Sequence, residues 1–346
     1  MLAADAVGKK LTRRRRLGGV RWAVRGVLVL VIVGAFLVGF DGMFYYPSRT
    51  VHYRPADFGL RHEDVTFVAS DGVRLHGWFL PATRLVPVSR RGASDDPTVV
   101  GGRGRSADPT DKADGATDNA AATAAAPAPQ ARGTVIHFHG NAANITNHIV
   151  LSQWLVWEGF NVFLFDYRGY GRSEGRPTRE GTIRDGHAAL DYVLSRPDVD
   201  RARVFAFGQS LGGAVATVVA AERPEIRAVV LDSTYSSHRR IAALHLQKLV
   251  LLRWPAEWIA RAGVSGGYEP LDYIGRIAPR PLLVIASARD EICFAQLGRE
   301  LFEAASEPKE FVLLEDGAHL ESVADNVGNT QRRIVRFFEQ AAASRD

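Results

Sequence analysis

The sequence predicts an α/β protein whose central sheet is mostly parallel and carries helices on both faces. Short apolar runs recur along the chain and alternate with segments of helical pattern. Most of these runs are apolar throughout, which is typical of strands that are buried on both faces. One run, residues 204–207, continues through Gly208-Gln209-Ser210-Leu211-Gly212 into an apolar helix, so a sharp turn joins a strand to a helix.

The first 40 residues differ from the rest of the chain in charge. They carry eight Lys and Arg residues against one Asp, in a chain of net charge +5. The remaining residues are therefore slightly acidic, and nothing in them indicates a nucleic-acid-binding domain. Residues 1–19, with the cluster Arg13–Arg16, are predicted to form a basic cytoplasmic tail.

Residues 20–40 are predicted to form a transmembrane anchor, because they are almost entirely apolar and long enough to cross a bilayer. The basic cluster before them should stay in the cytoplasm, which places residues 41–346 on the outer side of the cell membrane. A cleaved signal peptide is the alternative. A buried core helix is a weaker explanation, because it does not account for four adjacent arginines.

The α/β domain is predicted to occupy residues 41–346 and to begin with a hairpin. Its strands are residues 64–68 and 73–80, joined by a turn at 69–72. His76, in the second strand, is expected to be structural. Residues 89–132 are rich in Gly, Ala, Asp, Pro and Thr, which predicts a disordered insertion.

The rest of the domain continues the alternation. Predicted strands cover residues 134–138, 161–166, 204–208, 228–232, 281–286 and 310–314, and predicted helices cover 148–158 and 182–194. Residues 235–276 interrupt this order with helix-forming and aromatic residues. We expect a small helical cap there, although a crossover helix with a loop is the simpler alternative.

Ser210 is the candidate nucleophile. The glycines on either side of it permit a tight turn that lifts the hydroxyl out of the sheet. The amide of Leu211 starts the following helix and can face a developing negative charge. The alternative is a glycine turn with an ordinary solvated serine.

A serine nucleophile needs a base, and the base needs an acid that orients it. Asp290 follows the strand at 281–286 and His319 follows the strand at 310–314. The carboxyl ends of parallel strands meet at one edge of the sheet, so these groups should lie near Ser210. Glu291 is a weaker candidate for the acid, and His238 and His245 are weaker candidates for the base.

Other kinds of site have less support. Cys293 lacks the strand-turn-helix context of a nucleophile, and as the single cysteine it cannot form an intramolecular disulfide. The histidines show no metal-ligand spacing, so neither a metal nor a cofactor is expected. The second donor for an oxyanion is predicted to be the amide of Asn141, which follows Gly140. His139 is expected to brace that loop.

These motifs together resemble the α/β-hydrolase-domain family. The resemblance rests on His-Gly-Asn-Ala at 139–142, Asp-Tyr-Arg-Gly-Tyr-Gly-Arg-Ser at 166–173, Gly-x-Ser-x-Gly-Gly at 208–213, and the Asp290/His319 pair. It is strongest for the single-pass, membrane-anchored members, which include lysophospholipid and monoacylglycerol lipases and protein depalmitoylases. It implies the triad Ser210, Asp290 and His319, with the amides of Asn141 and Leu211 as oxyanion donors. The sequence departs from many members on both sides of the histidine: they often have Gly-His-Asn or Gly-His-x-Asp, and this chain has Ala318-His319-Leu320-Glu321.

The first functional hypothesis is therefore a membrane-anchored serine hydrolase that cleaves esters or thioesters of lipid-like acyl groups. A catalytically silent binding protein of the same fold is the alternative from another class. A peptidase or a haloperoxidase-like enzyme would use the same residues. The sequence predicts neither the physiological substrate nor the oligomeric state.

Overall fold

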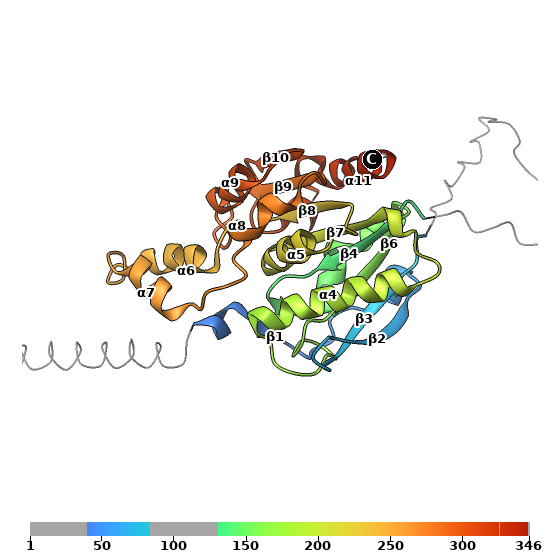
Figure 1. The fold of residues 1–346 in the computed structure, drawn as a ribbon, viewed down its shortest axis with the longest axis horizontal. Helices are drawn as coiled ribbons and strands as arrows, with labels where there is room; N and C mark the ends of the chain where they lie inside the picture. The colour runs from blue at the N-terminus through green and yellow to red at the C-terminus, as the bar shows by residue number, and fades with distance from the viewer. Residues whose placement is uncertain (1–39, 84–130, 325, 345–346) are drawn as a thin grey trace, which may run out of the picture. The chain divides into compact units, whose positions relative to one another are not determined.

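The computed structural model describes residues 40–83, 131–324 and 326–344 (Figure 1). The predicted basic tail, the predicted anchor except Phe40, and the predicted insertion except residues 131 and 132 lie outside these residues. Within the described part of the chain, no helix is both long enough and apolar enough to cross a membrane.

Eight strands form the main sheet, in the order β10-β9-β8-β7-β4-β6-β3-β2. The hairpin strands β2 and β3 pair antiparallel, as does β3 with β6, and all other neighbours are parallel. This confirms the predicted mostly parallel sheet. The strands are β2 (Glu63–Val68), β3 (Arg74–Leu80), β4 (Thr134–Phe138), β6 (Asn161–Phe165), β7 (Val204–Gln209), β8 (Ala228–Asp232), β9 (Leu282–Ser287) and β10 (Lys309–Leu314).

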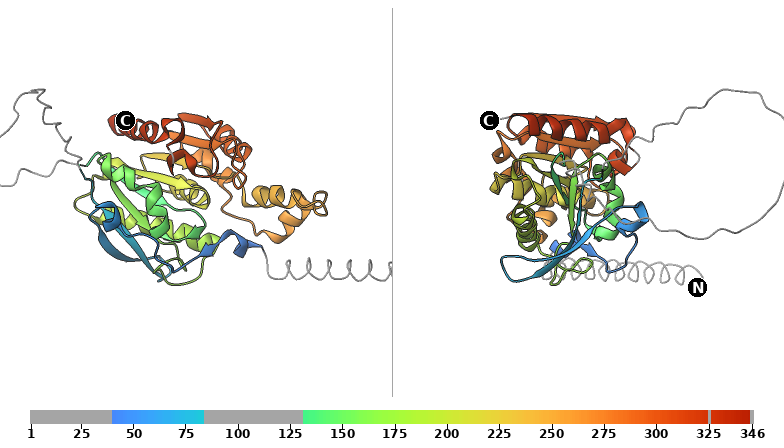
Figure 2. Two further views of the ribbon diagram at one scale, coloured as in Figure 1. Left: turned by 180° about the vertical axis from the view of Figure 1, so that it is seen from behind. Right: turned by 90° about the vertical axis from the view of Figure 1, so that its right-hand side faces the viewer.

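Helices cover both faces of this sheet. On one face, α4 (Arg179–Ser195), α5 (Leu211–Glu222) and α9 (Ala295–Ala304) pack against side chains such as Ile136 and Val229. On the other face, α3 (Gln153–Trp157) and α11 (Thr330–Ala343) pack against the alternate side chains, among them Val135 and Val230. Figure 1 shows α4 and α5 in front of the strands, and Figure 2 shows the sheet from behind. Because neighbouring residues face different helix layers, the central strands β4, β6, β7, β8 and β9 are buried along their whole length, whereas β2 and β10 at the sheet edges carry exposed charged residues.

The remaining elements are short. A second sheet pairs β1 (Tyr46–Pro47) with β5 (Ala142–Ala143). The predicted helix at 148–158 is instead broken into α2 (Ile145–His148), a 3-10 turn at Ile149–Leu151, and α3. The break lies at Ser152, whose backbone φ of −136° is outside the helical range. The other short helices are α8 (Pro270–Tyr273) and α10 (Glu321–Ala324), and further 3-10 turns lie at Asp41–Phe44, Pro55–Phe58, Arg201–Arg203, Ile274–Ile277 and Val327–Asn329.

The segment predicted as a cap contains two helices that do not lie on the sheet. They are α6 (His238–Gln247) and α7 (Ala256–Gly263), and they pack against each other. Figures 1 and 2 show this pair beyond the carboxyl ends of the strands, apart from the helices that cover the sheet. Residues 235–276 are therefore more than a single crossover helix.

Candidate active site

The turn between β7 and α5 has the strained geometry expected of a nucleophile turn. Ser210 lies between the two elements with φ 52° and ψ −121°, a conformation that non-glycine residues rarely adopt. A Cβ atom at Gly212 would overlap the carbonyl oxygen of Phe138, and one at Gly208 would lie 2.7 Å from the carbonyl oxygen of Gly212. Glycine is required at both positions, and the turn holds Ser210 at the carboxyl end of the sheet.

Asp290 and His319 form a hydrogen-bonded pair at the same edge. Nδ1 of His319 lies 2.7 Å from Oδ2 of Asp290. The other oxygen, Oδ1, accepts the backbone amides of Ile292 and Cys293 at 2.9 and 2.7 Å. The carboxylate is buried, and three donors hold it in place. Such an arrangement fixes the imidazole ring with Nδ1 protonated and leaves Nε2 available as a base.

The loop around His319 has its own support. The Glu321 carboxylate accepts the amide of Ala318 at 2.9 Å, and the amide of Leu320 donates to Oγ of Ser233 at 3.3 Å. Leu320 has a φ of 64°, so the backbone turns sharply just after the histidine. Leu320 and Glu321, at which the sequence departs from the family pattern, therefore form hydrogen bonds that fix the loop carrying His319.

The Ser210 hydroxyl has a sulfur neighbour. Its Oγ lies 3.7 Å from Sγ of Cys293, and among the described residues it forms no hydrogen bond with His319. Burial raises the pKa of the Cys293 thiol, so the thiol stays neutral beside the serine. Catalytic hydrogen bonds are often long before a substrate binds. The structure therefore brings Ser210 to the same sheet edge as the Asp290/His319 pair. The hydrogen bond between the Ser210 hydroxyl and the His319 ring is not formed in this structure.

The predicted oxyanion donors lie next to Ser210. Leu211 is the first residue of α5, where an amide has no partner within the helix. A Cβ at Gly140 would lie 3.6 Å from Cβ of Ser210, which places the Asn141 loop beside Ser210. Within the described part of the chain, neither the Asn141 amide nor the Leu211 amide donates a hydrogen bond. Both remain available to a substrate oxygen.

His139 orients the peptide that carries the Asn141 amide. Its Nδ1 lies 2.7 Å from the carbonyl oxygen of Gly140, which belongs to that same peptide. Since C=O and N–H point in opposite directions across a trans peptide, holding the oxygen also sets the direction of the amide. Burial lowers the pKa of His139 well below its usual value, so the ring is neutral and Nδ1 carries the proton. This agrees with the bracing role expected for His139.

A buried polar network, which the sequence pattern does not predict, lies behind Ser210. Gln209 accepts from His137 at 2.9 Å and donates to Asp232 at 2.8 Å, and Asp232 also accepts the Ser322 hydroxyl at 2.7 Å. The network links β4, β7, β8 and α10 beneath Ser210. The signal that could have revealed it is Asp232 itself, a carboxylate that ends the otherwise apolar strand β8 at the carboxyl edge of the sheet.

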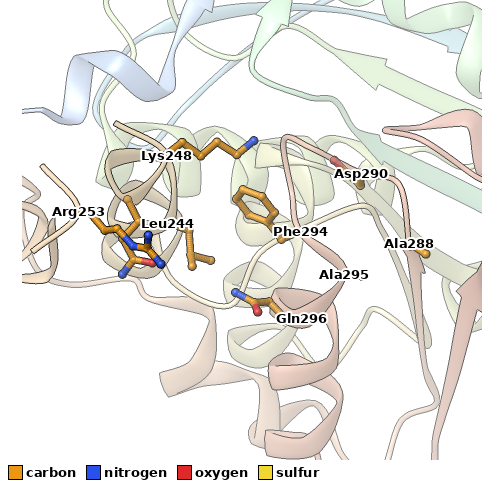
Figure 3. Close-up of a pocket in the computed structure, with 9 residues that line it drawn as sticks. Leu244, Lys248, Arg253, Ala288, Asp290, Phe294, Ala295 and Gln296 are labelled. Atoms are coloured by element: carbon orange, nitrogen blue, oxygen red, sulfur yellow. The ribbon is translucent and has the colours of Figure 1, made fainter. Parts of the chain in front are cut away.

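A pocket of about 490 Å³ adjoins the acid loop. Figure 3 shows Asp290 and Phe294 on one side and side chains of the α6 segment, including Leu244 and Lys248, on the other. Arg253 also lines this pocket. Hence the charged lining is cationic apart from Asp290, which is engaged with His319. No cluster of metal ligands occurs among the described residues.

Known proteins resemble this chain over most of its length. Residues 129–274 match the family model Hydrolase_4, described as serine aminopeptidase, S33. The uncharacterised protein YfhR of Escherichia coli K12 is 33% identical over 325 residues, which cover 91% of this chain and 94% of YfhR. The chain belongs to the same family as YfhR, and its residues 129–274 carry the Hydrolase_4 match. That match agrees with the predicted α/β-hydrolase family at the level of the fold.

Two further relatives agree with that assignment. The α/β-hydrolase domain-containing protein WAV2 of Arabidopsis thaliana is 29% identical over 90% of this chain and 92% of its own length. The Pyrococcus furiosus esterase Pf2001 superimposes with a TM-score of 0.61, at 21% identity, over 86% of this chain and 98% of that esterase. The structural likeness shows a shared α/β-hydrolase fold.

Proposed function

We propose that the chain is a serine hydrolase that cleaves carboxylic esters or thioesters of lipid-like acyl groups. The observation that carries the proposal is the hydrogen bond between the buried Asp290 and the partly buried His319, at the sheet edge where Ser210 occupies its strained turn. A buried carboxylate that orients an imidazole beside such a serine is the arrangement that nucleophilic acyl transfer requires.

In the proposed reaction, substrate binding closes the gap between Ser210 and Nε2 of His319. Oγ of Ser210 attacks the acyl carbon while His319 takes the hydroxyl proton. The amides of Asn141 and Leu211 donate to the oxygen that becomes negative. His319 then gives its proton to the leaving alcohol or thiol, which departs and leaves an acyl-serine. Water, activated by the same imidazole, releases the acid and restores Ser210.

An ester or thioester fits the site better than a peptide. Pf2001, which has the same fold, is described as an esterase, whereas the family model is described as a serine aminopeptidase. An aminopeptidase binds a positively charged amino terminus. Lys248 and Arg253 line the pocket beside Asp290, and their charges disfavour such a substrate. A peptidase is therefore the second candidate.

We further propose that residues 20–40 anchor the enzyme in the cell membrane, with residues 41–346 on the outer side. The support is the apolar run and the basic cluster before it. This agrees with the resemblance to membrane-anchored lipases and depalmitoylases. A bilayer would supply lipid-like acyl substrates directly.

Replacing the nucleophile tests the proposed chemistry. Ser210→Ala and His319→Ala should each lower turnover of a short-chain nitrophenyl ester by roughly 10⁴–10⁶-fold, and the double variant should be little worse, because the residues act as a unit. Ser210→Ala should also abolish labelling by a fluorophosphonate. Ser306→Ala, at an exposed serine, is the matched control and should label normally. A wild-type chain that neither labels nor turns over would instead indicate a silent binding protein.

A further inference from the structure

The turn between α6 and α7 exposes large apolar side chains. Leu249 is 55% exposed, Val250 89%, Leu251 80% and Trp254 96%. We call these four residues the tip. Single exposed apolar residues are ordinary, but a contiguous group of this size on a water-soluble surface indicates an interaction site.

The tip is a structured part of the chain. The amide of Leu249 donates to the carbonyl of Leu246 at 3.0 Å, and that of Leu252 to the carbonyl of Leu249 at 2.8 Å. Behind it, Arg240 on α6 pairs with Glu257 on α7 at 3.0 Å. These contacts hold the turn in shape while the tip side chains point away from the domain.

Basic residues surround the tip. Lys248 precedes it and Arg253 lies within it, and both are exposed. The other basic residues of 238–263 lie farther along the helices, and one of them, Arg240, is paired with Glu257. Near an anionic lipid surface Lys248 and Arg253 would each contribute about 1 kcal/mol of attraction. The combination of apolar centre and basic border suits a lipid headgroup layer.

The place where the predicted anchor ends is fixed to the same helix pair. The amide of Phe40 donates to the carbonyl of Gly263 at 2.7 Å, and the Phe40 ring occupies the space that a Cβ at Gly263 would need. Asp41 accepts the amide of Ser265 at 3.3 Å. Residue 40 therefore lies at the carboxyl end of α7, and the tip lies at its other end. Eight helical residues separate them, which is about 12 Å.

We propose that the tip inserts into the interfacial layer of a lipid bilayer beside the anchor. The proposal takes the anchor from the proposed function, but it does not require the proposed chemistry. A second copy of this chain is a poorer occupant, because a symmetric contact through the tip would bring two basic borders together. A bilayer offers hydrocarbon to the apolar side chains and phosphate to Lys248 and Arg253.

Insertion of the tip would bring the pocket beside Asp290 to the membrane. Leu244, Lys248 and Arg253 line that pocket and belong to α6 or to the turn that carries the tip. An acyl chain that leaves the bilayer along α6 would then reach this pocket, which Asp290 lines. This accounts for the position of the tip next to the candidate active site.

The test places an environment-sensitive fluorophore at the tip. Leu251→Cys, in the full chain, is labelled with a nitrobenzoxadiazole thiol reagent and reconstituted into vesicles of phosphatidylcholine and phosphatidylglycerol. Ser306→Cys, at an exposed position beyond the carboxyl end of α9, is the matched control, since it is the amino end of α9 that lines the pocket with Lys248 and Arg253. The wild-type chain measures background labelling, since its single cysteine, Cys293, is buried.

We expect the label at 251 to shift its emission to the blue and to be quenched by a lipid-borne spin label. The label at 306 should stay water-like and be quenched by iodide. Equal iodide quenching at both positions would overturn the proposal. A blue shift at 251 that depends on protein concentration rather than on lipid would also overturn it and would indicate contact between copies. Because neither readout uses turnover, an inactive enzyme would contradict the proposed function alone.

Discussion

The histidines beside the nucleophile turn are neutral because they are buried. The rings of His139 and His148 have centroids 5.0 Å apart, and those of His137 and His148 are 6.5 Å apart. Burial lowers the pKa of all three, and that of His137 falls to about 3. In an unfolded chain the same group titrates near 6.5. Below that pH the unfolded state therefore binds more protons than the folded state.

His137→Gln should reduce the loss of stability on acidification. An amide can still donate to Gln209, but it does not titrate. Above pH 6.5 the histidine is neutral in both states and adds no pH dependence. As the pH falls from about 6.5 towards 3, the wild type should lose up to about 1.4 kcal/mol per pH unit relative to the variant. Urea unfolding at several pH values between about 7 and 5 measures this, and parallel stability curves would contradict it.

At the scale of elements, the junction of β7 and α5 depends on close backbone contact. The start of α5 lies against the end of β4, and Gly212 is the point of contact with the Phe138 carbonyl. Gly213 is similarly close to Thr234, which follows β8. The two glycines after Ser210 therefore let one helix end touch the ends of two strands. A side chain at either position would push the helix, and with it the Leu211 amide, away from the sheet.

Gly212→Ala should destabilise the fold by about 3 kcal/mol, at the upper end of the usual cost of overpacking, because the backbone oxygen it meets cannot move aside. Gly275→Ala is the matched control. A Cβ at position 275 would have no neighbour closer than the carbonyl oxygen of Ala304, at 3.5 Å. The free energy of unfolding of this variant should therefore differ from that of the wild type by less than about 0.5 kcal/mol. Denaturant midpoints compare the two variants. If the variants were equally stable, the junction would be more adaptable than the contact indicates.

At the scale of the whole molecule, the sequence predicts what depends on local pattern. The apolar strands, the hairpin at β2 and β3, and the positions of Asp290 and His319 at strand ends all follow from periodicity and chain order. The break at Ser152 was missed because a helical pattern does not reveal where tertiary packing bends the chain. The proximity of Cys293 to Ser210, and of His139 to the Gly140 carbonyl, depends on how loops close in space.

The predicted insertion, residues 89–132, allows a test of whether composition alone identifies a segment that makes no specific tertiary contacts. Its flanks meet one turn: the amide of Thr83 donates to the carbonyl of Val156 at 3.0 Å, and that of Arg132 to the carbonyl of Gly159 at 2.9 Å. A short link can therefore replace residues 89–130. With four Gly and Ser residues in their place, loop-closure entropy predicts a free energy of unfolding between unchanged and about 1.5 kcal/mol higher. Turnover should be unaffected, and a chain with residues 89–130 scrambled should behave like the wild type. If the deletion lowered stability or turnover markedly while the scrambled chain did so too, the segment would make specific contacts that its composition does not predict.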